Sequence, residues 1–331
     1  MPMNNLGTVL VTGATGFIGY ELARQLGDRG IKPRLLVRRP LRAAILGSLT
    51  AELIQGDLES ATSLQRVVAG VDTVFHLGAR AIFEEYHLVR PTIVDGTAAL
   101  IKAAAAGGVQ RFVYSSSLLV YPDQRESIDE GTPARPRVGY GEAKLEAEAV
   151  LSQVAEQTGM KLAIVRLPHV YGARDLMFNQ IRQGRVAFPG DGKNLFAHMH
   201  VEDAARVLLA VADRGWTGVS PVADDVPMDW NLFFAVIKEH YPRFRYFGVP
   251  KWAALIGTHA MTPYRRLSRY PSLYTPDAVL SWNLNIPVKK GVLWNKLGLK
   301  PTYPTVYQGI PAALDDSIAF RWIHPIEDRM G

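Results

Sequence analysis

The sequence contains no cysteine, so disulfide bonds, thiolate zinc sites and cysteine nucleophiles are excluded. Long apolar runs are missing as well, and no stretch approaches the roughly 18 residues that a membrane-spanning helix needs. The first residues, Met1-Pro2-Met3-Asn4-Asn5, are polar and lack the pattern of a secretory signal peptide. We therefore expect a cytoplasmic protein without a membrane span.

Charge of one sign is not concentrated anywhere in the chain. There are 37 lysines and arginines against 31 acidic residues, a formal net charge of +6. Adjacent arginines occur only at Arg38-Arg39 and Arg265-Arg266. Without a basic stripe interleaved with aromatic residues, we expect a small-molecule substrate and no nucleic-acid partner.

A glycine-rich turn stands near the start of the chain. The apolar run Thr8–Val11 is typical of a buried strand, and Tyr20–Leu26 has the pattern of a helix. Gly13, Gly16 and Gly19 repeat every three residues around this turn. Such a turn brings backbone N–H groups towards an anion, and the helix dipole favours its charge. Gly13 permits the tight turn, Gly16 the approach of a pyrophosphate, and Gly19 close packing of helix on strand. An ordinary strand-turn-helix unit without a ligand shares this pattern, so other motifs must decide.

Short apolar strands alternate with helices through the first half of the chain. This alternation predicts an α/β fold with a doubly wound parallel sheet, a Rossmann fold. The further strands are expected over residues 34–37, 52–58, 71–79, 111–114 and 161–166. The further helices are expected over residues 97–106, 140–158, 204–212 and 230–240, with a helix and a loop within 177–190.

The alternation fades after residue 172, which sets the expected domains. We expect a Rossmann domain over residues 1–172, with 196–222 returning to it. Residues 173–195 and 223–331 would form a smaller substrate-binding region. Its Trp252, Trp282 and Trp294 are expected to serve mostly in core or lid packing, some of them lining an apolar pocket.

Several residues at strand ends suit a dinucleotide. Arg38 follows the second strand with no acidic residue nearby. An acidic residue there accepts a hydrogen bond from the ribose 2′-OH, whereas an arginine suits a 2′-phosphate, so Arg38 favours NADP over NAD. Asp57 either accepts from the adenine amino group or caps the next helix. His76 is expected to be a packed strand residue, and the small residues up to Ala79 leave room for a cofactor.

A second constellation carries acid–base chemistry. Tyr140 and Lys144 are four residues apart and share a face of the predicted helix. A nearby ammonium stabilises a tyrosinate and lowers the pKa of a tyrosine from its reference value of about 10. Ser117, at the end of a strand, can hold a substrate oxygen. Together they make a proton donor and acceptor for a carbonyl/alcohol pair, the partner chemistry of hydride transfer.

As a set, these motifs resemble the extended short-chain dehydrogenase/reductase superfamily over nearly the whole chain. The matching segments are Thr12–Gly19, Gly56-Asp57-Leu58, His76–Ala79, Ser115-Ser116-Ser117 with Val120-Tyr121, Tyr140 with Lys144, Arg166–Gly172, His200–Asp203 and Leu297–Pro301. The resemblance implies that Tyr140 is the catalytic acid/base, that Lys144 lowers its pKa and binds the nicotinamide ribose, and that Ser117 orients the carbonyl. It implies no metal, a possible homodimer, and cofactor contacts from Gly13, Thr15, Gly16, Phe17, Ile18, Gly19, Arg38, Asp57, Leu58, Leu77, Gly78, Ala79, Tyr140, Lys144, Pro168 and Val170.

Departures from the family pattern narrow the activity. Leu118-Leu119 replaces the Asp-Glu pair of nucleotide-sugar dehydratases, and Asn194–His198 lacks the arginine of sugar-nucleotide members. Ile93 stands where relatives have the asparagine of a proton relay. We expect an NADP-dependent oxidoreductase acting on an apolar or aromatic ketone, aldehyde or alcohol, similar to 3β-hydroxysteroid dehydrogenases and dihydroflavonol reductases. The alternatives are a nucleotide-sugar epimerase with tightly bound NAD and a non-catalytic NADP-binding sensor protein.

Overall fold

The computed structural model describes residues 6–79, 83–268 and 275–320. Within them, seven parallel strands form the central sheet: β1 (Val9–Thr12), β2 (Arg34–Val37), β3 (Glu52–Gln55), β4 (Thr73–His76), β5 (Arg111–Ser117), β6 (Lys161–Leu167) and β11 (Gly218–Pro221). Their order is β11-β6-β5-β4-β1-β2-β3. The chain starts in the middle of the sheet and winds outwards first one way and then the other, so the predicted doubly wound Rossmann fold is confirmed. The order reverses between β1 and β4, where such sheets bind ligands.

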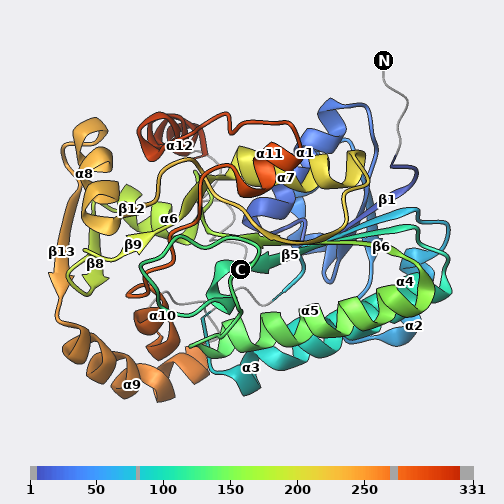
Figure 1. The fold of residues 1–331 in the computed structure, drawn as a ribbon, viewed down its shortest axis with the longest axis horizontal. Helices are drawn as coiled ribbons and strands as arrows, with labels where there is room; N and C mark the ends of the chain where they lie inside the picture. Colours follow the sequence, from blue (N-terminus) through green and yellow to red (C-terminus); the bar gives the residue numbers. More distant parts are fainter. Residues whose placement is uncertain (1–5, 80–82, 269–274, 321–331) are drawn as a thin grey trace.

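Helices cover both faces of this sheet (Figure 1). One face packs against α1 (Phe17–Asp28), α7 (Val201–Asp213) and α11 (Val292–Lys296). The other packs against α2 (Ala61–Val68), α4 (Gly96–Ala106) and α5 (Gly139–Thr158). Val9 and Val11 of β1 belong to the first core and Leu10 to the second. Successive strand residues point to opposite faces, so a strand covered on both sides is apolar throughout.

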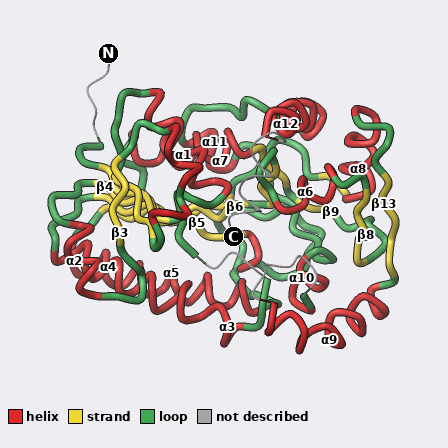
Figure 2. Tube along the Cα trace, turned by 180° about the vertical axis from the view of Figure 1, so that it is seen from behind, coloured by secondary structure: helices red, strands yellow, loops and turns green. Residues whose placement is uncertain are grey.

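A second region lies beside the sheet (Figure 2). The strands outside the central sheet pair two by two: β7 (His169–Tyr171) with β10 (His198–His200), β8 (Arg185–Pro189) with β13 (Arg245–Val249), and β9 (Leu195–Phe196) with β12 (Met228–Asp229). The helices of the second region are α6 (Leu176–Arg182), α8 (Trp230–His240), α9 (Lys251–Ser268), α10 (Pro276–Ser281) and α12 (Val306–Phe320). Aromatic rings dominate its core, and Trp230 stacks on Trp282 with ring centroids 5.6 Å apart.

The predicted elements are confirmed with shifted boundaries. The strands expected over 52–58 and 71–79 end earlier, at Gln55 and His76, where their pairing with β2 and β1 ends. Residues 177–190, expected to hold a helix and a loop, also contain the strand β8 at 185–189, which pairs with β13 some sixty residues later. A pattern within a short stretch of sequence does not show a pairing strand that lies so far along the chain. Among the described residues, no helix is long and apolar enough to cross a membrane.

The three tryptophans noted in the sequence differ in exposure. Trp282 and Trp294 are buried, as expected for core residues. Trp252, in contrast, is 68% exposed on α9, so two of the three tryptophans pack as expected for most of them.

Candidate active site and dinucleotide-binding site

The glycine turn packs tightly against the end of β4. Gly13 has φ +75°, and a Cβ on it would lie 2.7 Å from the backbone N of Gly78. A Cβ on Gly19 would lie 2.2 Å from the carbonyl oxygen of Gly13. Both positions therefore require glycine, one for the left-handed turn and the other for the contact of helix with turn. The turn is held close to the point where the strand order reverses.

The outer side of this turn is open. Thr15 and Gly16 are exposed, while Phe17 and Ile18 are half-buried and begin α1. The N–H of Gly16 donates to the carbonyl of Gly13 at 2.9 Å. In the described part of the chain, no side chain caps the N-terminus of α1. A helix start with accessible backbone and a glycine cradle fits the pyrophosphate of a dinucleotide.

A buried hydrogen-bond chain fixes the strand ends beneath the turn. The Thr12 hydroxyl accepts from the N–H of Gly78 at 2.9 Å and lies 2.7 Å from Nδ1 of His76. Nε2 of His76 lies 2.8 Å from the hydroxyl of Thr97. Burial, with a smaller effect of the Lys144 charge, lowers the pKa of His76 to about 3. His76 is a neutral packed strand residue, as predicted.

The residues expected near the adenosine lie beyond β2, β3 and β4. Arg38 is exposed directly after β2. Asp57 accepts from the N–H of Glu59 at 3.1 Å, whereas Ser60 caps α2. Leu58 is buried, with its side chain against Gly96. Leu77, Gly78 and Ala79 are half-buried after β4.

A cavity of about 230 Å³ opens between the sheet edge and the second region. Ser117, at the end of β5, and Tyr140, in the first turn of α5, both line it. Phe17 and Ile18 of the glycine turn and Pro168 and Val170 beyond β6 line the same cavity, so the dinucleotide cradle and the serine–tyrosine pair share one space. The rest of the lining is mostly apolar and includes Phe83, Leu118, Leu119, Leu167, Leu176, Met177, Phe196, Trp230, Trp282 and Ile286.

Lys144 lies behind this pair rather than in the cavity. Its side chain is 3% exposed, and Nζ donates to the carbonyl of Ser115 at 2.7 Å. Nζ is 4.5 Å from the ring centroid of Tyr114 and 5.8 Å from that of Tyr140. Burial lowers the pKa of Lys144 to about 7, with Glu148 opposing the shift.

The expected direction of the Tyr140 pKa shift is wrong in this structure. Burial raises the pKa of Tyr140 above its ordinary value. The expectation assumed a charged lysine beside the hydroxyl. Here Nζ is held by the Ser115 carbonyl and is itself desolvated, so its attraction does not outweigh burial.

Sequence reasoning missed a buried polar network next to this site. Glu148 of α5 receives two-pronged hydrogen bonds from Arg166 of β6, the shortest at 2.6 Å. The Ser116 hydroxyl also donates to Glu148, and Arg166 donates to the Tyr121 hydroxyl at 2.8 Å. Tyr140, Lys144 and Glu148 are spaced four residues apart and therefore lie on one face of α5, which the sequence alone could show. The pairing of Glu148 with Arg166 of β6 could not be read from the sequence.

A second polar group lines the cavity, and it too was not predicted. His169 of β7 and Asp175 both line the cavity, with Nε2 of His169 3.8 Å from Oδ2 of Asp175. Nδ1 of His169 lies 3.0 Å from Nδ1 of the fully buried His198, so one ring donates to the other. Oδ2 of Asp175 is buried and has no hydrogen-bond partner among the described residues. This pair offers a further polar contact inside a mostly apolar lining.

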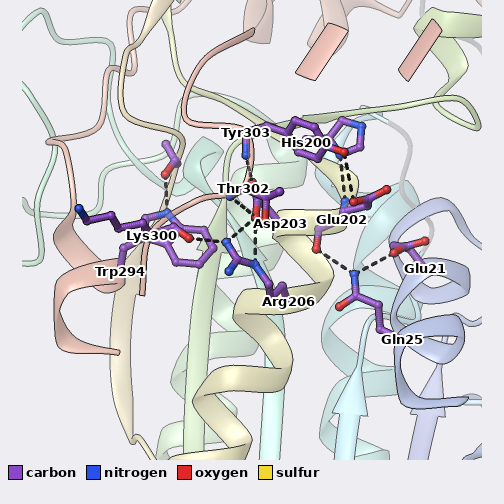
Figure 3. Close-up of polar contacts among 11 residues, drawn as sticks. Glu21, Gln25, His200, Glu202, Asp203, Arg206, Trp294, Lys300, Thr302 and Tyr303 are labelled. Carbon is purple, nitrogen blue, oxygen red and sulfur yellow. Dashed lines mark hydrogen bonds and ion pairs between the residues drawn. The ribbon is translucent and has the colours of Figure 1, made fainter. Parts of the chain in front are cut away.

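The predicted motif His200–Asp203 performs a structural task away from the cavity (Figure 3). Asp203, in the first turn of α7, accepts from the backbone N–H groups of Thr302 and Tyr303 at 2.9 and 2.8 Å. Arg206 donates to the same carboxylate at 2.7 Å. The motif thus fastens the segment before α12 to a helix of the Rossmann unit.

Comparisons with known proteins show the family of the chain. The model of the NAD dependent epimerase/dehydratase family matches residues 9–223. A 4-hydroxy-2-methyl-3-oxo-4-farnesyl-3,4-dihydroquinoline-1-oxide ketoreductase of Stigmatella aurantiaca is 33% identical, over 69% of this chain and 72% of its own length. A 3-beta-hydroxysteroid dehydrogenase of Mycolicibacterium neoaurum is 34% identical, over 55% of this chain and 53% of its own length.

Solved structures support the fold. The UDP-glucuronic acid 4-epimerase of Bacillus cereus superimposes with a TM-score of 0.76 at 18% identity, covering 94% of this chain and 99% of the other. At this identity the likeness concerns the fold alone. Fold, site and relatives together define an NAD(P)-dependent oxidoreductase of the Rossmann type. The chain belongs to the NAD-dependent epimerase/dehydratase family.

Proposed function

We propose that this protein interconverts a carbonyl compound and an alcohol on an apolar or aromatic small molecule, with NADP as the hydride carrier. The observation that carries the proposal is the shared cavity. Ser117 and Tyr140 line it together with the start of α1, so a carbonyl carbon between them would face a dinucleotide bound at the glycine turn.

The residues divide the chemistry of reduction between them. When bound, the dinucleotide supplies a hydride to the carbonyl carbon. The Ser117 hydroxyl donates a hydrogen bond to the carbonyl oxygen and orients it. The Tyr140 hydroxyl gives its proton to the same oxygen, which completes the alcohol. Lys144 acts from behind: its ammonium stabilises the tyrosinate that this step leaves, and oxidation runs the same transfers in reverse.

The apolar lining supports the choice of substrate. Rings from Phe83, Trp230 and Trp282 line the cavity together with the serine and tyrosine, and such a surface favours an apolar or aromatic molecule. Leu118 and Leu119 are buried at the positions where dehydratases carry an acid pair, so groups for eliminating water are missing from that place. His169 and Asp175 provide a polar contact for a second functional group of the substrate.

The test is a panel of hydrophobic ketones assayed by NADPH oxidation, with wild type and Tyr140→Phe. Removing the proton donor should lower kcat by about 10²–10⁴-fold, the usual contribution of a general acid. Tyr307→Phe is the matched control, because Tyr307 is 48% exposed on α12, and it should react like wild type. Undiminished activity of Tyr140→Phe would contradict the mechanism.

The same preparation separates the two alternatives. An epimerase with tightly bound NAD would copurify with NAD and show no net turnover of added cofactor. A sensor protein would bind NADPH without oxidising it for any ketone of the panel. Either result would replace the proposed reaction.

A further inference from the structure

One stretch of the chain has a composition that the proposed reaction does not explain. Residues 240–276 contain no aspartate or glutamate. They contain six lysines and arginines and eight tyrosines, phenylalanines and tryptophans. The basic residues are Arg243, Arg245, Lys251, Arg265, Arg266 and Arg269. The stretch includes β13 and α9, which follow one another at one end of the molecule (Figure 1).

Large apolar side chains project into solvent from these two elements. Trp252 and Ile256 of α9 are 68% and 63% exposed, and Phe247 of β13 is 53% exposed. Because Trp252 and Ile256 are four residues apart, they are neighbours on the outer face of α9. Thr258 on the inner face is buried. Single exposed apolar residues are normal, whereas a group of them indicates an interaction surface.

Exposed basic side chains accompany this group. Lys251 begins α9, and Arg245 lies on β13 beside Phe247. Arg245 donates to the carbonyls of Pro242 and Phe244 and has no carboxylate partner among the described residues. Asp191 lies at the margin of the face, where it lines a shallow hollow with Lys251. The face as a whole combines tryptophan, aliphatic side chains and positive charge.

We propose that β13 and α9 form a docking face for the surface of an anionic lipid bilayer. Tryptophan favours the boundary between acyl chains and headgroups, and lysine or arginine beside it is attracted to anionic lipids. An apolar face rimmed by basic residues is the pattern of a helix that lies in this boundary without crossing the membrane. A second copy of the chain fits less well, because it would bring two uniformly basic segments together.

The position of this face gives it a use, which rests on the proposed function. α9 packs against α10, whose last residue, Ser281, lines the substrate cavity together with Trp282. A protein docked through α9 would hold the cavity close to the bilayer, where apolar substrates concentrate. Docking itself does not depend on the reaction.

Flotation of the whole protein with vesicles tests the proposal. We expect binding to vesicles of phosphatidylcholine mixed with phosphatidylglycerol, much less to phosphatidylcholine alone, and weakening by salt. The double variant Trp252→Ser/Ile256→Ser should partition at least about tenfold more weakly, because both side chains lose their burial in the bilayer. Lys251→Glu should weaken partitioning about fivefold or more, the effect of one basic residue near an anionic surface.

Matched controls come from the far side of the molecule. Leu53→Ser removes a side chain that is 41% exposed on β3, at the opposite edge of the sheet, and Lys102→Glu reverses an exposed charge on α4. Both should float like wild type. Thermal unfolding must show that each variant is folded.

Three results would overturn the proposal. The first is wild type that does not bind the mixed vesicles. The second is a double variant that binds as well as wild type. The third is a wild-type dimer that the double variant converts to a monomer without lipid in sedimentation velocity, which would make the face a contact between copies. Tyr140→Phe separates docking from reaction, since it should float normally while losing ketone reduction.

Discussion

The charged form of Lys144 is useful to the proposed reaction but is disfavoured by its surroundings. Its ammonium is useful to the proposed reaction because it stabilises a tyrosinate. Its surroundings disfavour that charge: the side chain is 3% exposed, and burial lowers the pKa to about 7. The Ser115 carbonyl, the Tyr114 ring and the Glu148 carboxylate are groups that favour the charge.

This conflict makes folding stability depend on pH in a defined direction. Between a folded pKa of about 7 and the ordinary value of 10.5, the unfolded chain binds the proton and the folded chain does not. Stability therefore rises with pH through this window. Lys144→Met removes the titration. From pH 7 to pH 10 wild type should gain more than about 1 kcal/mol relative to this variant, measured by urea unfolding.

The exposed Lys102 supplies the control for this series. Lys102→Met removes a lysine that is exposed on α4, and it shows what the loss of a lysine costs without the loss of a buried side chain. A difference between wild type and Lys144→Met that stays constant or reverses between pH 7 and pH 10 would contradict the burial of a titrating lysine.

Arg38 tests the choice between the two dinucleotides. It is exposed directly after β2, where a 2′-phosphate on the adenosine ribose would lie. Hydrogen bonds to a charged group contribute about 1.5–3 kcal/mol, so Arg38→Ala should weaken NADPH binding about ten- to a hundredfold and leave NADH binding nearly unchanged. Fluorescence titration of both cofactors measures this.

Lys32, exposed just before the same strand, is the matched control for charge. Lys32→Ala should bind both cofactors like wild type. Stronger binding of NADH than of NADPH by wild type, or an equal loss for both in Arg38→Ala, would be inconsistent with a 2′-phosphate site.

Among the elements, those that could be predicted carry their signal within a short stretch. β1, the glycine turn and α1 follow one another in twenty residues, and α5 can be predicted from its length and regular pattern. β8 could not be predicted in the same way. Its five residues become a strand because β13, far along the chain, pairs with them.

In the candidate site, too, residues within a local pattern could be predicted, whereas residues brought there by the fold could not. Ser117, Tyr140 and Lys144 could be chosen from the sequence because two elements at fixed spacing carry them. Trp230 and Trp282 reach the cavity from α8 and from beyond α10, and no local pattern places them there. The Glu148 carboxylate lies on the predicted stripe of α5, but its role depends on Arg166, which only the folded sheet brings near.

For the whole molecule, one carboxylate joins the end of the chain to the Rossmann unit (Figure 3). Asp203 is 1% exposed and accepts from Thr302, Tyr303 and Arg206. Arg206 also donates to the carbonyl of Lys300, and its guanidinium lies 5.1 Å from the ring of Trp294. The C-terminal motif Leu297–Pro301 is thus held where the chain turns towards α12, which packs on α8 and β10.

Asp203→Ala should therefore lower the free energy of unfolding by about 3–5 kcal/mol, because it leaves two backbone N–H groups and a guanidinium without their partner. Hydrogen exchange should increase around residues 300–310 before it does in β1 or β4, because the Asp203 carboxylate binds the backbone of this segment directly. Glu202→Gln is the control: its carboxylate meets the Tyr303 hydroxyl at 3.4 Å, so its loss should cost less than about 1 kcal/mol. Equal costs for the two variants, or exchange that rises uniformly over the sheet, would show that the C-terminal segment is held by packing alone. A selective increase would mean that α12, and with it the wall of α8 that carries Trp230 into the cavity, depends on this one carboxylate.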